Sequence, residues 1–299
     1  MKASDRDVHV IVVAYGAPDQ LATCLDALQG AYPVTVIDNS SSEAVEAVAG
    51  ARGARYVDPA ENLGFAKGVN RGLASLSRPL GAVDVLLLNP DAVIHPDGVR
   101  ALVAALHDRP RIAAAAPTQL APGAEVPDRV AWPFPTPGGA WVEALGLGRF
   151  RRSPGFLVGS ILALRGEAID DVGDFDERFY LYAEETDWQR RATERGWEVR
   201  FCEDVVATHL GAGTDNLPER RELRFHAALE RYVRKWHGAF GWQVFRGGVI
   251  LGAGVRAVAL RSERARDAAR RAQLYWSGPD RIAQKRGAVP APDPNLTTT

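Results

Sequence analysis

The first third of the chain alternates short apolar runs with helical patterns, and this alternation constrains the fold more than any other feature. Strand-like runs lie at residues 9–15, 33–38, 56–57 and 83–88, and helical patterns lie at residues 18–30, 43–48, 64–76 and 96–106. Strands that alternate with helices through short connections form a largely parallel sheet with right-handed crossovers. The sequence therefore predicts an α/β layer of the nucleotide-binding type.

Polar residues stand where three of these predicted strands end. They are Ala14-Tyr15, Asp38-Asn39 and Asn89-Pro90-Asp91. Because the carboxyl ends of parallel strands share one edge, where open α/β sheets bind ligands, these residues are expected to lie together. Asp38 suits a base N–H or a ribose hydroxyl, and Tyr15 can stack on a base. The hard oxygens of Asp91 suit Mg²⁺ or Mn²⁺, held together with the phosphates of a substrate.

Residues 61–72 bring further polar groups to the start of a predicted helix. Gly64 permits close backbone approach, and the first N–H groups of a helix attract anions. Lys67 and Arg71 share a helical face, which is equally consistent with an ordinary solvated basic face. The segment matches neither the dinucleotide fingerprint G-x-G-x-x-G nor the P-loop, and both are missing from the whole chain.

A second polar cluster, Glu184-Glu185-Thr186-Asp187-Trp188, lies near the start of a helix predicted over residues 183–195. Acidic residues are favoured there by the helix dipole, so the cluster taken alone indicates capping more often than catalysis. His209 follows a predicted strand and precedes a flexible Gly-Ala-Gly segment. A lone histidine in this setting is most often an ordinary surface residue.

Composition limits the classes of protein that need to be considered. The 299 residues are 46% hydrophobic and carry a formal net charge of −1, which gives no global argument for a nucleic-acid partner. Only Cys24 and Cys202 are present, so neither a disulfide framework nor a cysteine metal site is expected. No signal-peptide pattern and no run of about 20 apolar residues is found. A cytoplasmic location is expected.

The rest of the chain is less regular. Residues 117–154 are rich in Pro, Gly and Trp and are predicted to be irregular, either a functional loop or a surface insertion. An apolar run follows at residues 156–164, strands are predicted at 197–201 and 205–209, and a charged helix at 217–236. The expected organisation is a domain over 1–215, divided into one half at 1–115 and another at 116–215. A helical extension over 216–276 and a disordered tail over 277–299 follow.

Taken together, residues 8–213 resemble the family 2 inverting glycosyltransferases, specifically the bacterial rhamnosyltransferase-like branch. The motifs occur in the family's order: Val12-Val13-Ala14-Tyr15-Gly16, Asp38-Asn39-Ser40-Ser41, Glu61-Asn62-Leu63-Gly64-Phe65-Ala66, Leu87-Leu88-Asn89-Pro90-Asp91, Gly173-Asp174-Phe175-Asp176-Glu177-Arg178-Phe179 and Glu184-Glu185-Thr186-Asp187. The resemblance implies a GT-A fold, a Rossmann-like, mostly parallel sheet with flanking helices. It also implies a nucleotide-diphosphate sugar as donor and Mg²⁺ or Mn²⁺ as cofactor.

The same resemblance implies roles for individual residues. Glu185 matches the catalytic base, usually aspartate in this family, with Glu184 as the competing candidate. Asp91 matches the last acid of the D-x-D motif, whose first acid is Asn89 here, and His209 matches a histidine that coordinates metal in some relatives. Glu184, Asp187 and Trp188 belong to the acceptor side. The donor-binding residues implied are Ala14, Tyr15, Asp38, Asn39, Asn62, Gly64, Lys67, Asn70, Asn89 and Asp91.

The implied activity is transfer of a sugar to a hydroxyl of a cell-surface glycan precursor. The first donor expected is dTDP-rhamnose, with UDP-galactose, UDP-galactofuranose and GDP-mannose as the others, and the acceptor is a glycan or a lipid-linked glycan. An inactive nucleotide-sugar-binding scaffold remains the alternative, because Asn89 and Glu185 depart from the commonest family residues. A nucleotidyltransferase ranks low, because the glycine-rich loop expected after its first strand is missing.

The C-terminal part carries a local excess of positive charge. Residues 246–286 contain ten basic residues and three acidic ones, interleaved with apolar residues. Such an imperfect amphipathic pattern suits the surface of an anionic membrane, which places a predicted peripheral contact at residues 240–286 on the inner face of the plasma membrane. A helix packed on the domain with its arginines in water fits the pattern equally well.

Overall fold

The structure is a computed structural model that describes residues 7–77, 79–81, 83–148, 155–211, 218–261 and 263–290. It divides into two compact units. Unit 1 comprises residues Met1–Trp132, Pro154–Glu177 and Glu184–Asn216, and unit 2 comprises Pro133–Ser153, Arg178–Ala183 and Leu217–Thr299. The boundary expected near residue 216 therefore separates the units only in part, because two segments from within residues 116–215 belong with the C-terminal helices.

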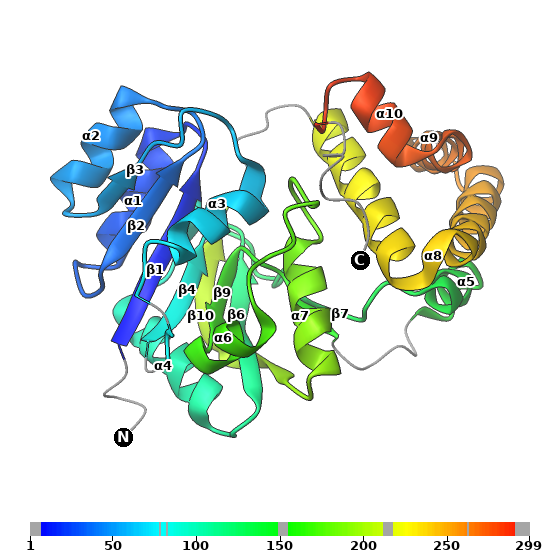
Figure 1. Cartoon of the computed structure of the whole chain (residues 1–299). Coiled ribbons are helices and arrows are strands. Elements are labelled where there is room, and N and C mark those ends of the chain that lie inside the picture. The colour runs from blue at the N-terminus through cyan, green and yellow to red at the C-terminus, as the bar shows by residue number, and fades with distance from the viewer. Residues whose placement is uncertain are drawn as a thin grey trace. The chain divides into compact units, whose positions relative to one another are not determined.

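Unit 1 is built on an eight-stranded sheet with the order β3-β2-β1-β4-β9-β6-β10-β5 (Figure 1). Strands β1, β2, β3 and β4 pair in parallel, β9 pairs antiparallel with β4 and β6, and β10 is parallel to β6. The predicted α/β layer is thus confirmed as a mostly parallel mixed sheet. The strands are β1 (Asp7–Ala14), β2 (Val34–Asp38), β3 (Arg55–Val57), β4 (Val83–Leu88), β5 (Ala92–Val93), β6 (Ile112–Leu120), β9 (Ile161–Leu164) and β10 (Glu198–His209).

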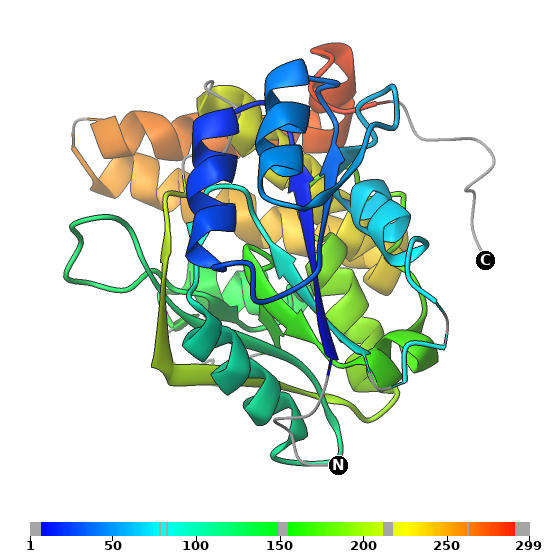
Figure 2. The same ribbon diagram turned by 90° about the vertical axis from the view of Figure 1, so that its left-hand side faces the viewer.

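Helices cover both faces of this sheet (Figure 1; Figure 2). The alternation along β4 shows the two faces: Leu86 and Leu88 pack with helices α1, α2 and α4, whereas Val85 and Leu87 pack with α3, α6 and α7. This burial on both sides explains why every residue of the strand except Asp84 is apolar. The helices are α1 (Pro18–Ala27), α2 (Glu43–Ala51), α3 (Gly64–Leu73), α4 (Pro96–His107), α6 (Gly166–Val172) and α7 (Glu184–Glu194).

Two glycines inside α3 let this helix lie close to strand β1. A Cβ atom at Gly68 would stand 2.8 Å from a methyl group of Val13, and one at Gly72 would stand 2.7 Å from a methyl group of Ile11. Glycine disfavours a helix interior by about 1 kcal/mol relative to alanine, so its use here reflects the close approach. The packing fixes α3, and with it the loop that precedes the helix, against the sheet.

The prediction of irregular chain over residues 117–154 is wrong in part. Strand β6 continues to Leu120, the short strands β7 (Ala131–Trp132) and β8 (Phe156–Leu157) form an antiparallel pair, and helix α5 spans Pro137–Ala144. Thr136 caps α5 by accepting a hydrogen bond from the Gly139 N–H at 3.1 Å. Residues 149–154 lie outside the described residues.

The two strands predicted at 197–201 and 205–209 are one strand, β10 (Glu198–His209), with a register shift between Cys202 and Val206. The shift falls where the sequence pattern predicts a break. The strand remains continuous because its pairing with β6 resumes after the irregularity. As a result, β10 runs far enough to bring His209 to the edge where β1, β2 and β4 end.

Unit 2 consists mainly of helices (Figure 1). Its core is aromatic and includes Tyr232, Trp242 and Tyr275. Helix α8 (Pro218–Ala259) is interrupted at Gly238, where φ is 65°, which separates the predicted charged helix from the apolar segment after it. Helices α9 (Glu263–Ser277) and α10 (Pro279–Lys285) follow. No helix within the described ranges is long and apolar enough to cross a membrane.

The expectation of a disordered tail over residues 277–299 does not hold for its first half. Residues Pro279–Lys285 form α10, and Ala283, Ala288 and Val289 are buried against Leu223 and Ala227 of α8. The helix begins with Pro279 at its first position, a signal that the low periodicity of the tail conceals. Residues 291–299 lie outside the described residues.

Candidate active site

The strand ends predicted to share an edge do share it. In the parallel set β2-β1-β4, the final residues Ala14, Asp38 and Leu88 lie at the same end of the sheet, and strand β10 ends there with His209. Strand β9 is antiparallel, so the residues before it, Gly159 and Ser160, also lie at this edge. We refer to this carboxyl edge of the sheet as the rim.

Asp38 organises the first part of the rim. Its carboxylate is fully buried and accepts hydrogen bonds from the Ser40 N–H at 2.9 Å, the Ser42 N–H at 2.8 Å and the Tyr56 hydroxyl at 3.0 Å. The Ser40 hydroxyl also donates to Asp38 and accepts from the Gly16 N–H at 2.9 Å. The carboxylate therefore shapes the loops after β1 and β2. The sequence predicted a contact of Asp38 with the nucleoside and did not predict this role in the loops.

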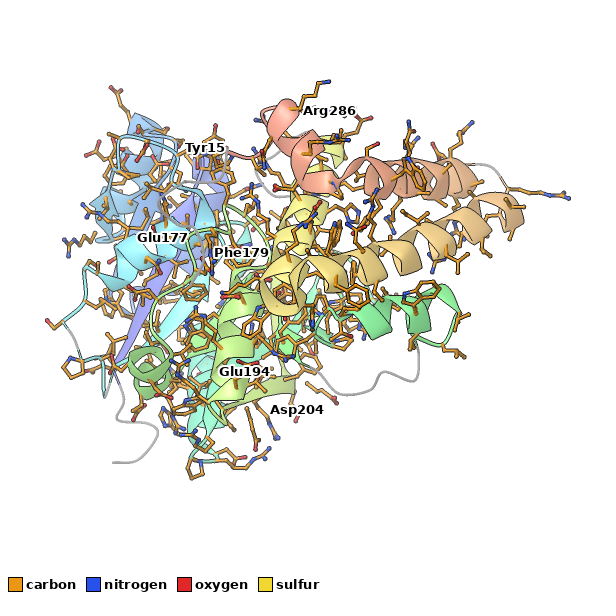
Figure 3. The ribbon with its side chains drawn as sticks, turned by 45° about the vertical axis from the view of Figure 1, so that its right-hand side comes forward. Tyr15, Glu177, Phe179, Glu194, Asp204 and Arg286 are labelled. Carbon is orange, nitrogen blue, oxygen red and sulfur yellow. The ribbon has the colours of Figure 1, made fainter. Side chains whose placement is uncertain are left out.

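Tyr15, the other nucleoside residue predicted at this edge, is half-exposed at the end of β1 (Figure 3). Its neighbours Gly16 and Ala17 both have positive φ, 65° and 55°, which turn the chain away from the strand before α1 begins. The turn leaves the Tyr15 ring open to solvent at the rim. An exposed ring beside a rigid loop suits stacking on a base, so the predicted role of Tyr15 is compatible with its position.

Asn39 and Asn62 hold the loop that leads into α3. The Asn39 amide donates to the Gly64 carbonyl at 3.0 Å and accepts from the Leu63 N–H at 3.3 Å. Asn62 accepts from the Gly64 N–H at 3.0 Å, and Gly64 has φ of 77°, which favours glycine. These contacts hold the start of α3, which has no side-chain cap, at the rim, and Lys67 in its first turn is partly buried.

Asn70 is engaged with another segment of unit 1. Its amide donates to the Phe175 carbonyl at 2.9 Å and accepts from the Phe175 N–H at 2.8 Å. It also donates to the carboxylate of Glu177 at 3.1 Å, a residue labelled in Figure 3. The structure thus gives Asn70 a positioning role, and its predicted contact with the donor stays a prediction.

Asp91 and His209 are brought together as predicted. Strand β5 pairs with β10 so that Ala92 faces His209, and the His209 Nε2 lies 3.3 Å from a carboxylate oxygen of buried Asp91. The Asn89 amide nitrogen lies 3.5 Å from the same His209 nitrogen. One carboxylate and one imidazole suit a divalent cation that takes its remaining ligands from phosphate oxygens. No cluster of three or more His, Cys, Asp or Glu side chains that could hold a metal ion occurs in the described ranges.

Glu184 and Glu185 begin helix α7, and both are buried. Burial raises the pKa of Glu185 to about 7, against the smaller opposing effect of backbone N–H groups, and burial together with the charge of Glu185 raises the pKa of Glu184. The Oε2 atom of each carboxylate has no hydrogen-bond partner among the described residues. A carboxylate with a pKa near neutrality, and with an oxygen that has no hydrogen-bond partner among the described residues, can accept a proton from a substrate hydroxyl.

Contacts of the neighbouring chain link Glu185 to the segment that carries Asp91. A Cβ atom on Gly159 would lie 3.4 Å from the Cβ and Cγ atoms of Glu185, so the backbone of Gly159 packs against that side chain. The next residue, Ser160, accepts a hydrogen bond from the Asn89 N–H at 2.9 Å. Glu185 is thereby connected through two short contacts to the segment that carries Asp91.

The residues directly before α7 have an unusual backbone. Tyr182 and Ala183 have φ values of 71° and 67°, in the left-handed region that residues other than glycine rarely adopt. Strain of this kind costs of order 1–3 kcal/mol per residue and is concentrated at functional sites. We interpret it as the consequence of turning the chain sharply so that Glu184 and Glu185 enter the helix.

Gln189 is a site residue that sequence reasoning missed. It is fully buried, and its amide accepts from the Leu157 N–H at 2.8 Å and donates to the Leu157 carbonyl at 2.7 Å and the Glu185 carbonyl at 3.0 Å. Gln189 thus acts as a strand partner for β8 and ties it to α7. The only signal in the sequence is its position one helical turn after Glu185, which is too weak to identify it.

Ser160 and Gln119 were also missed. Both are buried, and the Ser160 hydroxyl donates to the Gln119 side-chain oxygen at 2.7 Å. The amide nitrogen of Gln119 is buried without a hydrogen-bond partner among the described residues. Gln119 lies near the end of β6, so the pair adds polar groups to the rim beside Gly159.

The acceptor-side roles of Asp187 and Trp188 stay a prediction, and the structure shows both side chains engaged with other residues. Both side chains are fully buried: Asp187 accepts from the Arg191 guanidinium at 3.1 Å, and Trp188 donates to the Gly173 carbonyl at 2.9 Å. The Trp188 ring also stacks on Phe175 with centroids 5.8 Å apart. In a helix that starts with Glu184, these two positions point into the core of unit 1, where they hold α7 in place.

Comparison with known proteins identifies the family. Residues 9–160 match the sequence profile of Glycosyl transferase family 2, and residues 85–262 match that of Glycosyl transferase family group 2. The chain is 29% identical over 277 residues to an N-acetylglucosaminyl-diphospho-decaprenol L-rhamnosyltransferase of Mycobacterium tuberculosis, covering 81% of this chain and 90% of that protein. It is 26% identical over 239 residues to the low-salt glycan biosynthesis hexosyltransferase Agl10 of Haloferax volcanii, covering 76% and 72%.

Solved structures show the same fold at lower identity. A mannosyltransferase from Pyrobaculum calidifontis in complex with GDP-Man and Mn²⁺ superposes with a TM-score of 0.56 at 15% identity, covering 96% of this chain and 86% of that one. Glucosyl-3-phosphoglycerate synthase from Mycobacterium tuberculosis, in complex with Mn²⁺ and UDP, gives 0.53 at 19%, covering 76% and 80%. Because the fold is the GT-A-like one and the family profile spans residues 9–160, the chain belongs to glycosyltransferase family 2 and transfers a sugar from a nucleotide-sugar donor.

Proposed function

We propose that the protein is an inverting glycosyltransferase that moves rhamnose from dTDP-rhamnose to a hydroxyl of a lipid-linked glycan precursor, with Glu185 as the general base. The observation that carries the proposal is the position of Glu185, buried at the rim with an oxygen that has no partner among the described residues. The choice of sugar and acceptor is supported by the name of the Mycobacterium tuberculosis relative.

The reaction is a single displacement. Glu185 takes the proton from the acceptor hydroxyl, whose oxygen attacks the anomeric carbon as the bond from that carbon to the diphosphate breaks. Attack and departure occur on opposite faces, so the configuration at the anomeric carbon inverts. Since burial raises the pKa of Glu185 to about 7, the carboxylate is deprotonated and competent as a base above that pH. Glu184 is the alternative base.

The departing nucleoside diphosphate needs positive charge at the rim. Lys67, in the first turn of α3, would supply part of this charge, and the N–H groups of a helix terminus favour anions. Asp91 and His209 are the residues that would hold Mg²⁺ or Mn²⁺. The bound cation would neutralise charge on the diphosphate. Asp91 would offer the cation a carboxylate, whereas Asn89 would offer an amide in place of an acid.

The donor is proposed to lie along the rim from the loop after β1 to the loop after β4. Tyr15 contacts the base, and the α3 loop and the Asp91 segment contact the diphosphate and sugar. Asp38 and Asn39 act there mainly by shaping the loops that they hydrogen-bond. The full donor set proposed is Ala14, Tyr15, Asp38, Asn39, Asn62, Gly64, Lys67, Asn70, Asn89 and Asp91.

Protection against thermal unfolding tests the donor. The protein is heated with Mn²⁺ and one of dTDP-rhamnose, UDP-galactose, UDP-galactofuranose or GDP-mannose. A ligand at a hundred times its dissociation constant stabilises the fold by about 2.7 kcal/mol. The true donor should therefore raise the melting temperature most. If another sugar nucleotide raises the melting temperature more, that nucleotide would replace dTDP-rhamnose as the proposed donor. Absence of protection by all four would contradict the assigned site, and protection without donor hydrolysis or transfer would indicate a binding scaffold.

A further inference from the structure

Unit 2 exposes a band of apolar side chains that the proposed chemistry does not use. On the second half of α8, Leu251 is 45% exposed, Val255 is 55% exposed and Val258 is 89% exposed. Their spacing of four and three residues places them on one side of the helix. Soluble proteins seldom leave a continuous apolar stripe open unless it binds something.

Helix α5 extends this band. It packs directly on α8 because Gly248 and Gly252 carry no side chain: a Cβ atom at Gly252 would stand 2.9 Å from the Ala144 backbone. The Trp141 indole donates to the Val244 carbonyl at 2.9 Å and so lies along the same flank of α8. Figure 3 shows the two helices side by side. Just after α5, Leu145 is 67% exposed and Leu147 is 43% exposed.

We name the apolar face by these five exposed residues, Leu145, Leu147, Leu251, Val255 and Val258. It spans two helices that hold each other through backbone contacts, so it is a preformed surface. None of the five residues is a core position, since each is more than two-fifths exposed in the folded chain. The face therefore requires a partner outside unit 2.

Positive charge continues from one end of the apolar face. Arg261, Arg264 and Arg266 follow Val258 closely in the chain and are exposed at the connection between α8 and α9. Residues 240–286 carry a net charge of +7, whereas the whole chain carries −1, which leaves −8 for all other residues. The chain thus concentrates its positive charge on the same helices that carry the exposed apolar residues.

We propose that the apolar face and the adjoining arginines bind the surface of an anionic lipid bilayer, with α8 lying in the membrane interface. Apolar side chains enter the boundary between headgroups and acyl chains, while each arginine near an anionic surface adds about 1 kcal/mol. A second copy of the chain is a poorer partner, because an isologous dimer through this face would bring two clusters of +7 together. The surface argument is independent of the donor, and a lipid-linked acceptor of the proposed function would lie in such a bilayer.

Flotation with vesicles tests the proposal. The full chain is mixed at low salt with vesicles of phosphatidylglycerol and phosphatidylcholine, or of phosphatidylcholine alone, and the floated fraction is measured. Binding to the anionic vesicles at least tenfold stronger than to the neutral ones, and weakened by salt, is expected. Failure to float with anionic vesicles at low salt would overturn the proposal.

Matched variants locate the surface. Val258→Asp is expected to reduce flotation at least tenfold, whereas Val126→Asp, at a valine of unit 1 that is 78% exposed, should leave it unchanged. Arg264→Gln/Arg266→Gln should weaken binding and flatten its salt dependence. Equal flotation of Val258→Asp and the parent chain would contradict the assigned face, as would a dimer in light scattering that Val258→Asp dissociates without any vesicle binding. Nucleotide-sugar protection, measured on the same variants, reports separately on the donor site and is expected to be unaffected.

Discussion

Glu185→Gln is expected to stabilise the protein above pH 7, because the native carboxylate is held where its charge is poorly solvated. Burial raises the pKa of Glu185 from its ordinary value of 4.5 to about 7. A carboxyl whose pKa is raised by folding contributes stability that is fully present below pH 4.5 and is lost as pH rises to 7. The two pKa values differ by a free energy of about 3 kcal/mol. Glutamine carries no charge at either pH and therefore avoids this loss.

The assay is thermal or urea unfolding of both chains between pH 4 and pH 9. The free energy of unfolding of the variant minus that of the wild type should be about 3 kcal/mol larger at pH 8 than at pH 4. For a chain of this size this corresponds to roughly 5 °C in melting temperature. Glu194→Gln is the matched control, since Glu194 lies on the same helix with its side chain 53% exposed (Figure 3). If the stability of the wild type and of Glu185→Gln changed with pH in the same way, the burial argument would be refuted.

Three further predictions concern the support of the site. Gln189→Leu should destabilise the protein by about 2–4 kcal/mol, because the Leu157 N–H and carbonyl lose their buried partners; unfolding in urea measures this, and a loss below about 1 kcal/mol would contradict it. Gly72→Ala should cost about 1–2 kcal/mol in urea unfolding, since the new methyl group meets the Cγ2 atom of Ile11 at 2.7 Å. An unchanged free energy of unfolding would contradict the close approach of α3 to β1. His209→Ala should weaken Mn²⁺-dependent nucleotide binding about tenfold, a loss of about 1.4 kcal/mol, in calorimetry; unchanged Mn²⁺ dependence would remove His209 from the cation site.

Features that depend on local pattern were predicted well from the sequence. The parallel strands and the shared edge of Ala14, Asp38 and Asp91 follow from periodicity and the chemistry of single residues. The nearness of His209 to Asp91 followed from the family resemblance and is confirmed by the pairing of β5 with β10. These features need little knowledge of which distant segments meet.

Features that depend on distant partners could not be predicted. Asn70 binds Phe175 and Gln189 binds Leu157, contacts that join residues 105 and 32 positions apart. The burial of Trp188 depends on where α7 starts, and the sequence pattern leaves that start uncertain by a residue or more. Helix α5 was hidden because its cap, Thr136 followed by Pro137, lies within a run of prolines and glycines that reads as a loop.

The most direct test of the account is transfer by wild type and Glu185→Gln, measured together with donor binding. With dTDP-rhamnose, Mn²⁺ and an N-acetylglucosaminyl-diphospho-lipid acceptor, the wild type should form the rhamnosylated lipid at a rate that rises as pH passes through about 7. The variant should bind the donor as tightly as the wild type and form no product. Transfer by Glu185→Gln at the wild-type rate would contradict the assignment of Glu185 as the base.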